Sequence, residues 1–185
     1  TDIYVEEGEK IKKGDLLAKI DDQKLKNNLN SAQTAVKEAE IAVKKAEVAK
    51  EISENNLRES RAALNEAQSN YSQWKSDYER DKKLYQKDAI AEAKFEQTKT
   101  QFEKAGAQLE RMKAAAASAE KSVEIADLDI ENSREKLKKA ENELENARLK
   151  LKDTELRSPI TAKVLRDFAE EGEFTGVGQP LFEIA

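Results

Sequence analysis

Residues 6–20, EEGEKIKKGDLLAKI, return near the other end of the chain as residues 170–184, EEGEFTGVGQPLFEI. The two stretches share seven residues at a constant separation of 164, and the shared pattern is Glu-Glu-Gly-Glu followed by Gly-x-x-Leu-x-x-Ile. Each copy is too short to bury a hydrophobic core by itself. The repeat therefore predicts that the two ends of the chain pair into one small β-domain.

The residues that break helices are concentrated in the same two ends. Both Pro and five of the six Gly lie there, and between residues 21 and 158 the only Gly or Pro is Gly106. The ends also carry short alternating stretches typical of strands, at residues 16–20 and 162–165. We expect a mostly helical α+β chain, with short β segments on either side of a very long helical region.

The helical region has a hydrophobic repeat of seven residues, and each heptad carries one large and one small residue. In the first half the large positions are Leu29, Val36, Val43, Leu57, Leu64, Tyr71, Tyr78 and Tyr85, interrupted by Lys50, and the small ones are Ala32, Ala39, Ala46, Ser53, Ser60 and Ala67, followed by Trp74. In the second half the large positions are Phe95, Phe102, Leu109, Ala116, Val123, Ile130, Leu137, Leu144 and Leu151, and their companions are Thr98, Ala105, Met112, Ala119, Ala126, Ser133, Ala140 and Ala147. Such a seam predicts a coiled coil and excludes disorder.

The repeat and the seam together predict a hairpin. One continuous helix of about 135 residues would hold its ends roughly 200 Å apart, so the β halves could not meet. The large-residue register also shifts between Tyr85 and Phe95, which places the fold-back at residues 86–91. We expect two antiparallel helices of about 65 residues, each about 95–100 Å long. Asp21 or Asp22 can cap the first helix, and the second should end before Ser158, which precedes a Pro.

Composition excludes most enzyme classes. The 185 residues include no His and no Cys, so a Ser-His-Asp triad, a Cys-His dyad and an ordinary zinc site are all excluded. The carboxylates alternate with Lys rather than cluster. We therefore expect no enzyme, no catalytic or metal-binding residues and no cofactor. A net charge of −5 with mixed signs gives no basic surface for nucleic acid.

A β-domain split by a long helical hairpin resembles the periplasmic adaptors, also called membrane fusion proteins or the HlyD family, of bacterial efflux pumps and type I secretion systems. The resemblance covers the whole chain and rests on residues 3–21, on residues 156–160 and on Gly172, Gly178, Leu181 and Ile184. It implies an antiparallel two-helix coiled-coil hairpin inserted between the halves of a biotinyl/lipoyl-like β-domain. We expect no working lipoyl or biotinyl carrier, because the position of the modified Lys is taken by the hairpin.

The resemblance also implies partners. The family carries an Arg-x3-Leu-x6-Ser pattern at the hairpin tip, where the outer-membrane channel docks; Arg80 and Leu84 match it, and Ala91 replaces the Ser. The expected partner-binding residues are Arg80, Leu84, Lys87, Asp88, Ile90 and Ala91. An inner-membrane transporter would be engaged through domains absent from this fragment. The full-length protein is expected in the periplasm or cell envelope, anchored to the membrane, as a trimer or hexamer.

The expected organisation has five segments. These are a first β half-motif at 1–21, helix 1 at 22–86, the tip at 87–91, helix 2 at 92–157 and a second β half-motif at 158–185. Two alternatives stay open: a structural coiled-coil scaffold whose seam joins separate chains, and an adaptor-like envelope protein without an outer-membrane channel. The bulky residues of the distal third, among them Trp74 and Tyr85, could fill the seam or also form a partner surface.

Overall fold

The computed structural model describes residues 2–168, 172 and 178–185. The chain divides into two compact units, one formed by residues 1–41 with 135–185 and the other by residues 42–134. Two helices, α1 (Gln23–Tyr85) and α2 (Glu92–Lys152), run through both units. The strands are β1 (Asp2–Ile3), β2 (Lys10–Ile11), β3 (Leu16–Lys19), β4 (Glu155–Arg157), β5 (Ala162–Asp167) and β6 (Phe182–Ile184).

The first unit contains the β-domain, which is built from both ends of the chain. One sheet has the strand order β1-β3-β4 and the other the order β2-β5-β6, and every pairing is antiparallel. Each sheet therefore combines strands from before α1 with strands from after α2. The core residues are Val5, Ile11, Leu17 and Val164, with Leu156, Ala162, Phe182 and Ile184 packed against them. The predicted pairing of the two ends is confirmed.

The internal repeat is visible in the backbone of the β-domain. Gly8 and its counterpart Gly172 have φ angles of 91° and 80°, and Gly14 and its counterpart Gly178 have φ angles of 97° and 89°. Only Gly enters this region without steric cost, so both copies use it at the same turns. The Glu residues of the second copy, at 170, 171 and 173, lie outside the described residues.

Helix α1 begins after an acidic pair. The Asp21 carboxylate accepts a hydrogen bond from the Gln23 amide (3.1 Å), which satisfies one of the amides left unpaired at a helix start. The neighbouring Asp22 carboxylate contacts the ammonium groups of Lys26 at 2.8 Å and Lys19 at 3.1 Å. Hydrogen bonds from Lys26 and Lys19 lower the pKa of Asp22 below its ordinary value. Asp21 therefore provides the cap, while Asp22 connects the last turn of the β-domain with the helix.

The predicted end of the second helix is wrong. Helix α2 ends at Lys152, not at residue 157, and residues 155–157 form β4. The Thr154 hydroxyl donates to the Leu151 carbonyl (2.6 Å), which closes the last turn. Leu156 then pairs with Ala18 in the sheet and packs on the core. Sheet pairing and apolar burial thus end the helix before Pro159 does.

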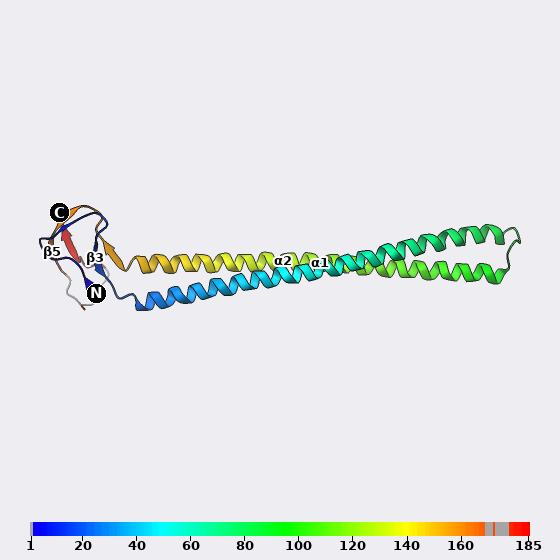
Figure 1. Ribbon diagram of the computed structural model, residues 1–185, viewed down its shortest axis with the longest axis horizontal. Helices are drawn as coiled ribbons and strands as arrows, with labels where there is room; N and C mark the ends of the chain where they lie inside the picture. Colours follow the sequence, from blue (N-terminus) through cyan, green and yellow to red (C-terminus); the bar gives the residue numbers. More distant parts are fainter. Residues whose placement is uncertain (1, 169–171, 173–177) are drawn as a thin grey trace. The chain divides into compact units, whose positions relative to one another are not determined.

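In the second unit α1 and α2 lie side by side and are joined by a turn (Figure 1). We call residues 42–134 the arm. Every predicted seam position of the arm is buried or half-buried, including Lys50. The most buried apolar residues are Ala67, Ala105, Leu109, Ala116, Ala126 and Ile130. The antiparallel hairpin is therefore confirmed.

Three ion pairs join the helices along one flank of the arm. Their atoms are Glu47 Oε1 with Arg134 Nη2 at 3.0 Å, Lys50 Nζ with Asp127 Oδ1 at 2.8 Å, and Arg61 Nη2 with Glu120 Oε1 at 3.1 Å. The hydrogen bond to Asp127 raises the pKa of Lys50. Each partner is at least partly exposed, so these pairs set the helix register more than they stabilise it. In the part of the chain that the structure describes, neither helix has an apolar stretch long enough to cross a bilayer.

Candidate docking site at the hairpin tip

The turn at the tip is closed by an Asp rather than a Gly. Asp88 has a φ of 56°, in the left-handed region. Its amide donates to the Tyr85 carbonyl (2.9 Å), and the Ala89 amide donates to the Leu84 carbonyl (2.9 Å). This pair of bonds is the Schellman arrangement, which satisfies carbonyls left open at a helix end and usually places Gly where Asp88 stands. Asp88 thus has a backbone role in the turn.

The start of α2 lacks a side-chain cap. Helix α2 begins at Glu92, so Ala91 occupies the position that Ser, Thr, Asp or Asn prefers. The Ala91 carbonyl accepts from the amides of Lys94 (3.0 Å) and Phe95 (3.2 Å), as expected at a helix start. A methyl group cannot accept a hydrogen bond, so Ala91 leaves the first amides of α2 without a side-chain partner. The Ser of the family pattern would have supplied that partner.

Below the turn, aromatic rings fill the seam. Tyr85 stacks on Phe95 (centroids 4.8 Å apart), Tyr78 on Phe102 (4.9 Å), and Tyr71 lies tilted against Phe102 (5.4 Å). Tyr78 also stacks on Phe95 at 5.8 Å. The rings are half-buried between the two helices. The seam-packing interpretation is therefore confirmed for these five rings.

A buried polar pair interrupts the aromatic seam. Thr98 and Asp81 are 3% and 8% exposed, and the Thr98 hydroxyl donates to the Asp81 carboxylate at 2.7 Å. The sequence placed Thr98 in the seam, but we did not identify Asp81. Its position could have identified Asp81 as a seam residue. It lies seven residues after Trp74, in the heptad register that contains Ala67 and Trp74. The pair thus joins α1 and α2 by a buried hydrogen bond near the tip.

The predicted docking residues divide into two groups. Arg80, Leu84 and Lys87 are spaced at i, i+4 and i+7 on α1 and the turn that follows it, so the structure brings these three together on one exposed face. They line a shallow groove together with Ser76, Glu79 and Lys83. The other three, Asp88, Ile90 and Ala91, belong to the turn, where Ile90 is half-buried.

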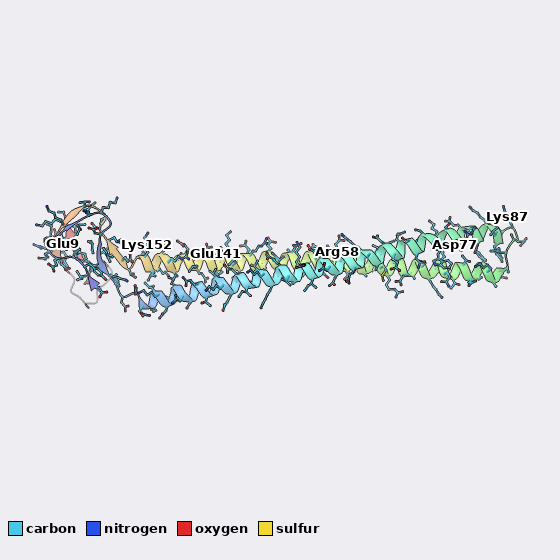
Figure 2. The ribbon with its side chains drawn as sticks, viewed as in Figure 1. Glu9, Arg58, Asp77, Lys87, Glu141 and Lys152 are labelled. Atoms are coloured by element: carbon cyan, nitrogen blue, oxygen red, sulfur yellow. The ribbon has the colours of Figure 1, made fainter. Side chains whose placement is uncertain are left out.

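The groove at the tip is amphipathic and basic. Leu84 is 37% exposed and supplies the apolar part of the groove. The guanidinium of Arg80 is held by the Asp77 carboxylate at 2.5 Å, and its Nε lies 4.0 Å from Asp81. Figure 2 shows Asp77 and Lys87 near the end of the hairpin. Arg80 is thus oriented from its own helix while its side chain stays 64% exposed. This arrangement of charged and apolar side chains can bind a protein surface.

Comparisons with known proteins found likenesses in structure only. No protein-family model matches the chain, and no curated protein sequence matches it. Among solved structures it is similar to the periplasmic adaptor protein EmrA, with 24% identity, a TM-score of 0.45, and coverage of 98% of this chain and 66% of EmrA. It is also similar to MacA from Actinobacillus actinomycetemcomitans, with 25% identity, a TM-score of 0.47, and coverage of 100% of this chain and 45% of MacA.

A third similar structure is matched over almost its whole length. The soluble domain of LipC, a membrane fusion protein of a type I secretion system, is 13% identical with a TM-score of 0.48, and the match covers all of this chain and 94% of that one. The chain therefore spans less than two thirds of the EmrA and MacA chains and nearly all of the LipC domain. The three structures are those of a periplasmic adaptor protein, of MacA, and of a membrane fusion protein of a type I secretion system.

Proposed function

We propose that this chain is the hairpin-bearing part of an adaptor that links an inner-membrane transporter to an outer-membrane channel in an efflux or type I secretion system. The observation that carries the proposal is the exposed face of Arg80, Leu84 and Lys87 at the end of a hairpin whose seam is closed and internally satisfied. The residues of this face do not contribute to the seam, so they are available for contact with a partner. The proposed location is the periplasm or cell envelope.

The tip would act by geometry and not by chemistry. The stacked rings and the Asp81–Thr98 pair hold the two helices in one alignment, so the docking face is formed before the partner arrives. A preformed surface loses less conformational entropy on binding. Arg80 supplies a charged donor of the residue type enriched at the hot spots of protein interfaces, and Leu84 adds an exposed apolar contact beside it. Several copies, three or six, would place their arms side by side with all tips pointing toward the channel.

The experiment is affinity purification of the full-length protein from crosslinked envelopes of its own organism. The native protein should bring down an inner-membrane transporter and an outer-membrane channel, both identified by mass spectrometry. The double variant Arg80→Ala/Leu84→Ala should lose the channel and keep the transporter. The control Arg58→Ala, a substitution of an exposed mid-arm cation, should retain both. Recovery of neither protein with the native chain, or equal channel recovery with the tip variant, would overturn the proposal.

A further inference from the structure

One carboxylate near the tip lies between the seam and the exposed face of α1. Asp81 is only 8% exposed, and its Oδ2 accepts a hydrogen bond from the Thr98 hydroxyl of α2 at 2.7 Å. Its other oxygen, Oδ1, lies 4.0 Å from Nε of Arg80, which is within reach of an ion pair but too far for a hydrogen bond. Asp81 therefore contacts the interior of the seam with one oxygen and faces Arg80 with the other.

The seam does not need this carboxylate in order to satisfy Thr98. The Thr98 hydroxyl also lies 3.2 Å from the Lys94 carbonyl, the contact that Thr commonly makes within a helix. The heptad register of Asp81 holds small residues in most other heptads, among them Ser60 and Ala67. A small residue would avoid the cost of removing a charge from water. Packing of the seam alone thus does not explain a buried Asp at this position.

Arg80 is held by two carboxylates of its own helix. Its Nη2 lies 2.5 Å from Oδ1 of Asp77, one turn earlier, and its Nε faces Oδ1 of Asp81. The side chain is still 64% exposed, so a partner can reach the guanidinium. Arg61 and Arg134 of the arm differ, because each contacts a single carboxylate on the opposite helix. An Arg that is already restrained has less conformational freedom to lose on binding.

From these contacts we infer that Asp81 is a positioning residue for the docking face. Its carboxylate, oriented by Thr98, attracts the Arg80 guanidinium and, together with Asp77, holds it in the direction in which a partner meets it. The inference rests on the proposed function, because it concerns how Arg80 is presented to the channel. The groove at the tip is lined by residues of α1 and of the turn. Through Thr98 and Asp81, α2 also influences this groove.

The positioning role requires the charge of Asp81, whereas packing requires only its size. An Asn has nearly the same shape, and its side-chain carbonyl oxygen can accept the hydrogen bond from Thr98. It carries no charge with which to attract Arg80. The substitution Asp81→Asn therefore keeps the contact inside the seam and removes the attraction between Asp81 and Arg80.

Chemical labelling of arginine tests this attraction without any partner. Purified full-length protein is treated with phenylglyoxal, and peptide mass spectrometry follows the modification rates of Arg80 and of Arg58, an exposed mid-arm cation that serves as internal reference. Asp81→Asn should raise the rate at Arg80 relative to Arg58 about twofold, because a weak ion pair is lost. Glu103→Gln, which removes an exposed charge from α2, should leave the ratio unchanged. No rise with Asp81→Asn, or an equal rise with Glu103→Gln, would overturn the inference.

Recovery of the channel from crosslinked envelopes gives the second measurement. Asp81→Asn should lower channel recovery about threefold and leave transporter recovery unchanged, as expected when an exposed Arg loses one of its two restraints. In an Arg80→Ala background, where Leu84 still supplies part of the contact, Asp81→Asn should cause no further loss. A further loss of the same size would mean that Asp81 acts through the stability of the hairpin, and it would overturn the inference.

The two measurements distinguish a failure of this inference from a failure of the proposed function. If Asp81→Asn raises the labelling of Arg80 in a protein that recovers no channel, the hold of Asp81 on Arg80 is supported and the proposed function alone is rejected. If Arg80→Ala/Leu84→Ala loses the channel while Asp81→Asn recovers it at the native level, the positioning role alone is rejected.

Discussion

The part of the arm next to the tip and the middle of the arm use the same heptads in different ways. Near the tip, aromatic rings stack across the seam, and the buried Asp81 is satisfied by Thr98. In the middle the seam is rich in Ala, admits Lys50, and leaves large apolar side chains pointing outward. The comparison teaches that the same heptad pattern gives an aromatic, internally hydrogen-bonded seam near the tip and an Ala-rich seam with exposed apolar side chains in the middle.

The largest expected loss of stability comes from a substitution in the aromatic part of the seam. Tyr78 lies against both Phe95 and Phe102, so Tyr78→Ala should destabilise the hairpin by about 3 kcal/mol. The mid-arm substitution Leu57→Ala, at a half-buried seam position, should cost about 2 kcal/mol. Urea unfolding of both variants measures the difference. If Leu57→Ala proved the more damaging of the two, the tip region would not be the better-packed part.

The next largest loss of stability is expected when the hydrogen bond between Thr98 and Asp81 is removed. Thr98→Val keeps the shape of the side chain but removes the hydroxyl that donates to the buried Asp81 carboxylate. The substitution should lower the free energy of unfolding by about 2 kcal/mol. Thr100→Val, on the exposed face of α2, should stay within about 0.5 kcal/mol.

The double variant Thr98→Val/Asp81→Leu checks the cause. Replacing both partners by apolar groups also removes the buried carboxylate that lost its hydroxyl donor, so most of the lost stability should return. A double variant less stable than Thr98→Val would mean that the pair acts through something other than the hydrogen bond.

Because the start of α2 has no side-chain cap, a capping residue introduced there should increase the stability of the hairpin. Ala91→Ser places a hydroxyl at the first position of the helix cap and should stabilise the hairpin by about 1 kcal/mol. Ala89→Ser, two residues earlier in the turn, serves as the control and should change little. Thermal unfolding distinguishes them, and equal effects of the two substitutions would contradict the placement of the cap.

The smallest expected effects concern pH. The chain has no His, so its stability should be nearly constant from roughly pH 5 to 9. The raised pKa of Lys50 means that its contribution is complete below the ordinary Lys pKa of 10.5 and is lost as the pH rises through the folded-state value. The lowered pKa of Asp22 means that its contribution is complete above 3.8 and is lost as the pH falls through the folded-state value.

These signs can be checked by melting temperature. Lys50→Met should gain stability relative to the native protein as the pH passes 10.5, since only the native protein loses an ion pair there. Lys45→Met, an exposed substitution outside the seam, should show no such trend. A Lys50→Met difference that is flat with pH would indicate that the contact with Asp127 does not form in solution.

The sequence predicted the features that repeat. The heptads give the seam because burial recurs with the helical period, and the matched glycines give the β-domain because positive φ angles favour one residue type. Features decided by a single local interaction were missed. Asp81 was overlooked because a carboxylate is not expected in a seam, and the end of α2 was misplaced because strand pairing by Leu156 overrides a continuing helical pattern.

The candidate docking site was predicted only as a set of positions. Side-chain directions separate Arg80, Leu84 and Lys87, which share an exposed face, from Asp88, whose backbone makes the turn. The sequence held no Gly to mark that turn, so the left-handed residue could not be identified beforehand.

One measurement tests the division between the tip and the middle of the arm most directly. The same photoreactive amino acid is introduced at Leu84 and, separately, at Ile125 in the full-length protein, and both are activated in living cells. The account predicts that Leu84 captures an outer-membrane channel, whereas the exposed mid-arm position Ile125 captures no channel. The same product from both positions, or a channel captured from Ile125 and none from Leu84, would contradict it.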